Sequence, residues 1–167
     1  PAGNDNVQNV PRGFDWRDDE PASLVYAMPL DSGFIKKQVE FHDAVYSMSA
    51  PFTQEAKELF KTKTRFSGVI WGNNKVALVT EVLRGKQTSK VSRYSSADGS
   101  MEVLYERNLT DAYKNPGSPV LTKNTFGREV IQMTDNGTKI LMNNPVGSSD
   151  QGDLPFISKF DLATKKN

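Results

Sequence analysis

The 167-residue chain has no cysteine and only one histidine. The lack of cysteine excludes structural disulfides, cysteine nucleophiles and cysteine-ligated zinc sites. It leaves the cellular compartment open, because many exported bacterial proteins also lack cysteine; export to the periplasm is one option if the source is bacterial. We expect neither a cofactor nor a bound metal.

Long apolar runs and clustered charge of one sign are also missing. No stretch reaches the roughly 18–20 apolar residues of a membrane span. Lys and Arg number 21 against 20 Asp and Glu, and the two signs are mixed along the chain. We therefore expect no membrane span and no nucleic-acid partner.

Helix-forming patterns are scarce. Only Thr53–Phe60 combines a cap-like threonine with helix formers, and its place in the sequence favours a turn leading into a strand. The remaining apolar segments are short, rich in β-branched residues and separated by turn residues. The sequence predicts an all-β protein.

The clearest hairpin lies in Arg65–Val82, where two apolar runs flank Gly72-Asn73-Asn74. A similar order of an aromatic residue, a tryptophan, a polar turn and an apolar strand occurs in Gly13–Tyr26. Trp16 and Trp71 mark the two copies, at a period of about 55 residues, near the size of a propeller blade. We expect a repeated four-stranded unit.

Counting strands divides the chain into a polar tail or linker, residues 1–10, and a partial β-propeller, residues 11–167. Its blades are predicted at residues 11–63 and 64–107, with an incomplete one at 126–167. The expected strands are Phe14–Trp16, Leu24–Met28, Ala44–Met48, Glu58–Thr62, Phe66–Trp71, Val76–Val82, Lys90–Tyr94, Met101–Tyr105, Val130–Met133, Ile140–Met142 and Phe156–Leu162.

The fold class is thus a partial propeller of about two and a half to three four-stranded antiparallel blades. Leu24–Ala27 is a continuous apolar run, as expected for a strand covered on both faces. Propellers close with about 4–8 blades. We therefore expect the chain to be a piece of a longer protein. Its sheet faces and edges would be uncovered in isolation, so we predict that the isolated piece self-associates.

Few residues are candidates for chemistry. His42 is the only possible imidazole base, but a polar residue at the entry of a strand is the more ordinary interpretation. Asp18-Asp19-Glu20 and the pair Asp150 and Asp153 could ligate calcium, yet they lack EF-hand spacing and fit acidic turns. We assign no catalytic residue and no metal ligand, and the substrate-binding residues stay unknown.

The aromatic residues allow two interpretations. Phe14, Trp16, Phe66 and Trp71 occupy repeat positions expected to pack between blades, so we predict core. Alternatively, Trp16 and Trp71 form an exposed platform, which would make the chain a self-contained β-sheet ligand- or carbohydrate-binding module. The long segment Asn108–Pro119, rich in helix and strand breakers, is the best candidate for a contact loop.

Three groups of residues carry a family resemblance: Pro11-Arg12-Gly13 with Trp16–Leu24, Arg65–Gly68 with Trp71-Gly72, and Gly147 with Gly152–Phe156. Together they resemble the N-terminal propeller of prolyl oligopeptidase-family serine peptidases, in the branch of the glutamyl endopeptidases. The segments Pro29–Phe34 and Ser148–Leu154 depart from the family pattern, which leaves the ligand preference open.

The resemblance implies that the propeller and the catalytic residues lie in separate domains. In such enzymes an α/β-hydrolase module follows the propeller and carries a Gly-x-Ser-x-Gly elbow. This sequence has no such elbow, since Gly147-Ser148-Ser149 lacks the closing glycine. We therefore expect a non-catalytic portion of a serine peptidase that gates or helps to bind peptide substrates, with the downstream hydrolase domain as its partner. A complete small hydrolase using His42 is the least favoured alternative.

Overall fold

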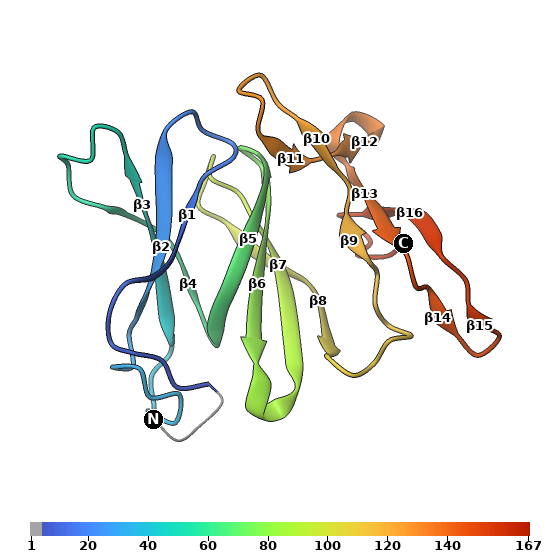
Figure 1. The fold of residues 1–167 in the computed structure, drawn as a ribbon, viewed down its shortest axis with the longest axis horizontal. Coiled ribbons are helices and arrows are strands. Elements are labelled where there is room, and N and C mark those ends of the chain that lie inside the picture. Colours follow the sequence, from blue (N-terminus) through green and yellow to red (C-terminus); the bar gives the residue numbers. More distant parts are fainter. Residues whose placement is uncertain (1–4) are drawn as a thin grey trace.

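The computed structural model describes residues 5–167, which fold into antiparallel β-sheets linked by turns (Figure 1). The strands are β1 (Arg12–Trp16), β2 (Ser23–Pro29), β3 (Asp43–Ser49), β4 (Lys57–Thr62), β5 (Arg65–Asn73), β6 (Val76–Leu83), β7 (Thr88–Tyr94), β8 (Met101–Asn108), β9 (Ser118–Pro119), β10 (Leu121–Lys123), β11 (Glu129–Ile131), β12 (Met133–Thr134), β13 (Lys139–Asn144), β14 (Ser148–Ser149), β15 (Gly152–Asp153) and β16 (Phe156–Asp161). Two 3-10 turns, η1 (Arg84–Lys86) and η2 (Asp135–Gly137), are the only helical segments within residues 5–167.

The first two sheets are four-stranded meanders, in the orders β1-β2-β3-β4 and β5-β6-β7-β8. They contain all eight strands predicted for the first two units. The third sheet is also four-stranded, and together the sheets confirm an all-β fold with blade-like sheets, consistent with a partial propeller. Figure 1 shows the three sheets side by side in chain order. Within the described residues no helix has the length and apolar character needed to cross a membrane.

The third sheet differs from its prediction. β13 pairs with β16 on one side, and on the other side with both β9 and β12. Val130–Met133, predicted as one strand, is divided between β11 and β12. Ser118–Pro119, predicted as loop, is strand β9. The strand position next to β13 is therefore assembled from two short pieces, with the β10–β11 hairpin inserted between them.

The core lies in two layers, one at each sheet boundary. Val25, Val45, Phe60, Trp71 and Val79 belong to the layer between the first and second sheets. The other layer joins the second and third sheets through Val76, Leu78, Val91, Leu104, Ile131, Ile140, Met142, Phe160 and Leu162. Successive residues of β6 from Val76 to Val79 alternate between the two layers, which explains why this part of its sequence is continuously apolar.

The run Leu24–Ala27 behaves differently, and its prediction was wrong for this chain. Val25 and Ala27 are buried against the second sheet, but Leu24 and Tyr26 are only partly buried on the opposite face. No sheet of the described residues packs over that face. The sequence of β2 suits two covered faces, and only one of them is covered here.

The predicted tail, residues 1–10, falls partly outside the described residues. From Asp5 onward it is hydrogen-bonded into the fold. The carboxylate of Asp5, which is 7% exposed, accepts hydrogen bonds from the backbone N–H groups of Arg84 at 2.6 Å and Gly85 at 2.7 Å. The Val7 N–H donates to the carbonyl of Gly33 at 2.9 Å. This segment thus ties the first sheet to the second, and from Asp5 onward the predicted polar tail or linker is hydrogen-bonded to the two sheets.

Candidate functional site

A buried charged cluster joins the first two sheets. Arg65, at the start of β5, donates through Nη2 to Asp31 Oδ2 at 2.7 Å and through Nη1 to Asp43 Oδ1 at 3.0 Å. Both carboxylates are fully buried. Arg12, at the start of β1, pairs with the other oxygen of Asp43. Arg12 and Arg65 thus begin the first strands of the first and second sheets and meet at one group of carboxylates, which we call the Asp31–Arg65 cluster.

His42 belongs to this cluster. Its Nδ1 lies 2.7 Å from Asp31 Oδ2, and its backbone carbonyl accepts a hydrogen bond from Arg65. Burial opposes ionisation of Asp31, but the hydrogen bonds from Arg65 and His42 outweigh it and lower the pKa of that carboxyl. The imidazole is therefore bonded to a structural carboxylate and lies at the entry of a strand, as the ordinary interpretation of His42 predicts.

The acidic turn Asp18-Asp19-Glu20 is occupied by internal ion pairs. Arg17, 5% exposed, contacts Asp19 at 2.7 Å and Glu20 at 3.0 Å. Its guanidinium also lies over the ring of Trp71, 4.4 Å from the centroid. Two of the three carboxylates thus hold an arginine between the first two sheets.

Asp18 faces the β10–β11 hairpin. Its carbonyl accepts a hydrogen bond from the Asn124 side chain at 2.6 Å, and its carboxylate lies 3.8 Å from Arg128. Burial raises the pKa of Asp18, although Arg128 acts in the opposite direction. Asp153, in the other predicted pair, accepts a hydrogen bond from Ser148 across the β14–β15 turn. Within residues 5–167 no three acidic or histidine side chains form a group able to hold a metal ion.

The predictions for the aromatic residues have different outcomes. Trp71 is 1% exposed and belongs to the core, as predicted, whereas Trp16 is 44% exposed and Phe14 is 62% exposed. Core was the wrong prediction for these two. The platform hypothesis also fails in the form that pairs Trp16 with Trp71, because only one of the two tryptophans reaches the surface.

The two tryptophans are nevertheless equivalent in the repeat. Trp71 points from the second sheet toward the first. Trp16 pairs with Leu24, on the face of the first sheet that points away from the second. Each tryptophan therefore faces the position of a preceding sheet, and within the described residues only Trp71 has one.

The uncovered face of the first sheet is aromatic. Phe14 stacks on Tyr26 with ring centroids 5.1 Å apart, and Tyr26 stacks on Tyr46 at 5.6 Å. Trp16 contacts Phe52 at 6.3 Å. We call these five residues the aromatic face. Both faces of the first sheet therefore carry apolar or aromatic side chains, and only the face toward the second sheet is covered.

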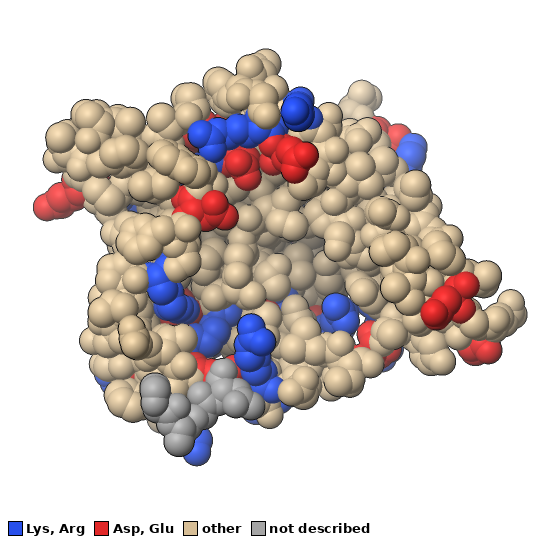
Figure 2. Space-filling model, viewed as in Figure 1, with Lys and Arg blue, Asp and Glu red and all other residues tan. Residues whose placement is uncertain are grey.

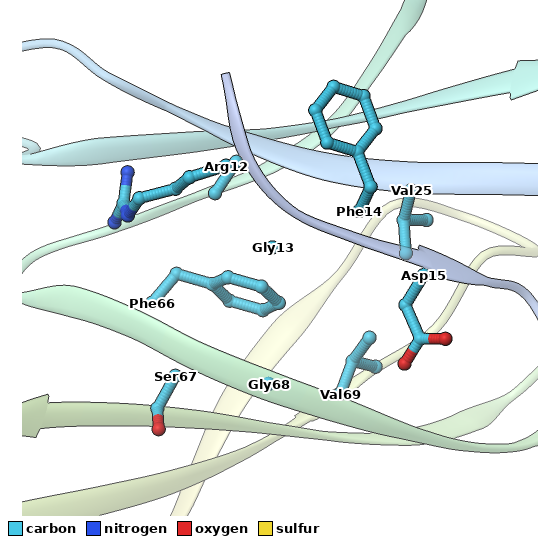
Figure 3. A pocket seen from close by; sticks show the side chains of 10 residues that line it. Arg12, Gly13, Phe14, Asp15, Val25, Phe66, Ser67, Gly68 and Val69 are labelled. Carbon is cyan, nitrogen blue, oxygen red and sulfur yellow. The ribbon is translucent and has the colours of Figure 1, made fainter. Parts of the chain in front are cut away.

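A pocket of about 290 Å³ lies between β1 and β5. Figure 3 shows the two strands facing each other across it, with the ring of Phe66 in the space between them. Ten residues line this inter-strand pocket: Arg12, Gly13, Phe14, Asp15, Val25, Ala27, Phe66, Ser67, Gly68 and Val69. In the same view as Figure 1, the surface is hollowed at its middle and charged side chains lie mostly around the hollow (Figure 2).

Sequence reasoning did not find this pocket. It pointed to Arg12-Gly13 and to Arg65–Gly68 as motifs, and the structure brings these two segments together at one cavity. The signal was the repetition of arginine, aromatic and glycine residues in the opening strand of each unit. The sequence gives no information on the distance between these two strands, so the pocket could not be predicted from it.

The segment proposed as a contact loop is partly ordered by the third sheet. Asn144 donates to the carbonyl of Asn115 at 3.0 Å, and Ser118–Pro119 pairs with β13. Tyr113, at its middle, is 69% exposed. The exposed part of the segment is thus shorter than its sequence indicated.

Comparison with known proteins gives one consistent match. The chain is 33% identical over 171 residues to a probable glutamyl endopeptidase, chloroplastic, of Oryza sativa subsp. japonica. It is 35% identical over 173 residues to the protein of the same name in Arabidopsis thaliana. Each match covers 98% of this chain and 18% of the relative, so the chain spans less than a fifth of the relatives' length. No protein-family model matches the sequence.

Proposed function

We propose that this chain is a non-catalytic propeller portion of a prolyl oligopeptidase-family serine peptidase of the glutamyl endopeptidase type. The match to two proteins named as glutamyl endopeptidases, over 98% of the chain, carries the proposal. The motifs Arg65–Gly68 and Trp71-Gly72 that resemble this family lie in β5. Arg65 belongs to the Asp31–Arg65 cluster, Phe66–Gly68 line the inter-strand pocket, and Trp71 is in the core.

The two ends of the sheet stack support a longer parent protein. Trp16 faces the position of a preceding sheet, and β16 at the other end has a strand neighbour on one side only, apart from a single bridge between Asp161 and Lys166. A further blade would cover the aromatic face, and a further strand of the third sheet would pair with β16. The division into residues 1–10, 11–63, 64–107 and 126–167 belongs to this proposal, with β9 added to the third blade.

In the parent protein the propeller would act on access and binding, and a downstream α/β-hydrolase domain would supply the catalytic serine. The propeller would limit the size of the peptides that reach that domain and lend residues to hold them. The exposed side of the Asn108–Pro119 segment, with Tyr113, is a candidate for contact with the domain or the peptide.

The test begins with the reading frame beyond Asn167. We expect further repeats and a hydrolase module with a Gly-x-Ser-x-Gly elbow. The longer protein should cleave a fluorogenic peptide at glutamate and react with a fluorophosphonate, and replacing the elbow serine by alanine should abolish both. The 167-residue chain should do neither. A frame without a hydrolase module, or intrinsic peptidase activity of the short chain, would contradict the proposal.

In the alternative, a self-contained ligand- or carbohydrate-binding module, Trp16 would have to form the binding platform without Trp71, which is buried. A single exposed tryptophan, with Phe52 beside it, is a smaller platform than the sequence indicated. Titration with soluble oligosaccharides, followed by tryptophan fluorescence, tests it directly. Saturable quenching that Trp16→Ala removes would favour this alternative.

A further inference from the structure

The inter-strand pocket is bordered by two unpaired strand edges. β1 and β5 each stand at the end of their sheet's strand order and have a strand neighbour on one side only. Their other edges line the same cavity (Figure 3). A free strand edge presents a row of backbone N–H and C=O groups that can pair with an added extended chain.

Both edges are irregular at the pocket. The register of β1 shifts between Arg12 and Asp15, and that of β5 shifts between Phe66 and Gly68. The Phe66 N–H donates a hydrogen bond to the Asp43 carboxylate at 2.8 Å. On β5, the backbone groups that can pair with an added peptide therefore begin at Ser67. Such bulges interrupt regular pairing and redirect side chains, and they are frequent near binding sites.

The pocket has room next to its backbone. A Cβ atom built on Gly68 would meet no other atom within 4 Å, and the same holds for Gly13. Gly68 does not have the left-handed backbone conformation that excludes other residues, whereas Gly13 has φ +63°. The glycine at 68 therefore leaves open space beside β5 without being needed for the course of the chain.

The lining of the pocket combines apolar and polar groups and is balanced in charge. Phe66 and Val69 are partly exposed and supply apolar side chains, Ser67 adds a hydroxyl, and Arg12 and Asp15 are the charged lining residues, one of each sign. Its lining residues carry no net charge and give no reason to select an anion or a cation. Its volume, about 290 Å³, is at the lower end for ligand sites and suits one large side chain rather than a whole ligand.

From these observations we propose that the inter-strand pocket is a peptide subsite. It takes an extended peptide whose backbone pairs with the free edge of β1 or β5 and whose apolar side chain enters beside Phe66 and Val69. The assignment of peptides as the ligand class rests on the proposed function, while the position and the preference for an apolar side chain rest on the pocket itself.

The test uses the ¹⁵N-labelled chain and two capped tripeptides, acetyl-Ala-Phe-Ala-amide and acetyl-Ala-Gly-Ala-amide. With the phenylalanine peptide we expect saturable shifts of the Gly13, Ser67, Gly68 and Val69 amide signals. One side chain and a few hydrogen bonds give a Kd on the order of 1 mM. The glycine peptide, which lacks the inserted side chain, should bind at least ~10-fold more weakly.

Gly68→Val fills the pocket, and its Cβ has room, so the fold should persist. This variant should bind the phenylalanine peptide at least ~10-fold more weakly than the wild type. Thr122→Val is the matched control, because it places the same side chain on the exposed strand β10, outside the pocket. Circular dichroism and the fluorescence of buried Trp71 verify the fold of both variants.

Unchanged binding by Gly68→Val, equal binding of the two peptides, or no shifts up to tens of millimolar peptide would overturn the subsite. None of these results depends on peptidase activity. A parent protein without peptidase activity would overturn the proposed function and leave the binding result standing, so the two failures are distinguishable.

Discussion

Replacing Arg65 by methionine should destabilise the protein more than any other single change in the charged clusters. The substitution keeps most of the side-chain volume and removes the cation that serves two fully buried carboxylates, Asp31 and Asp43. Breaking a buried ion pair by removing one partner costs about 3–5 kcal/mol, because it leaves uncompensated buried charge. This is a large part of the roughly 5–15 kcal/mol that stabilises a typical domain.

The pH dependence of this loss separates the ion pair from packing. In the wild type the folded-state pKa of Asp31 is lowered from its ordinary value of 3.8. Its ionisation therefore stabilises the fold above about pH 4, and this contribution is lost as the pH falls below that value. Without Arg65 the buried carboxyl favours its protonated form, so the deficit of the variant should shrink between pH 7 and pH 3.

Urea denaturation at pH 7, 5, 4 and 3 measures both effects, with the free energy of unfolding taken from linear extrapolation. Arg93→Met is the matched control, because its partner Glu102 is 43% exposed and its loss should be much smaller. Adding Asp31→Asn to Arg65→Met should recover part of the stability. A loss below about 1 kcal/mol at pH 7, or a deficit independent of pH, would refute a stabilising role for the cluster.

Three further substitutions test other parts of the fold. Asn124→Ala removes the hydrogen bond to the Asp18 carbonyl and should cost about 1 kcal/mol in urea unfolding, with faster amide exchange in the hairpin; unchanged exchange would contradict the contact. Gly33→Ala places a Cβ 2.0 Å from the Val7 carbonyl oxygen at φ +87°, and should cost at least about 1–3 kcal/mol and release Val7 from protection against exchange. Phe14→Lys introduces charge into the aromatic face and should shift the isolated chain toward monomer in sedimentation velocity, whereas a chain that is monomeric without the substitution would contradict self-association through this face.

The outcome for the Asp98-Gly99 turn shows where local sequence is sufficient. Asp98 accepts a hydrogen bond from the Ser100 N–H at 3.0 Å, and Gly99 takes φ +74°, as the predicted turn requires. Hydrogen bonds from Ser100 also lower the pKa of Asp98 to about 2. This turn depends on neighbouring residues alone, so the strands on either side of it, β7 and β8, were predictable.

The third sheet shows where local sequence is not sufficient. β9 and β12 are two short pieces, 14 residues apart from Pro119 to Met133, that share one neighbouring strand. Neither piece has enough alternation to be recognised, because each is stabilised by pairing with β13 rather than by its own pattern. The inserted β10–β11 hairpin could be placed only when its contacts with Asp18 were known.

The sequence by itself determined the all-β class, the strands of the first two sheets and the repeat that links Trp16 to Trp71, because strand periodicity and turn chemistry are local properties. Only the tertiary structure decided that Trp71 is buried while Trp16 is exposed, since burial depends on whether another sheet packs over the residue. It also decided that Arg65, Asp31 and His42 form one cluster and that the first strands of two sheets border a pocket. Distances between segments far apart in the chain are fixed by packing, and the sequence pattern of neither segment contains them.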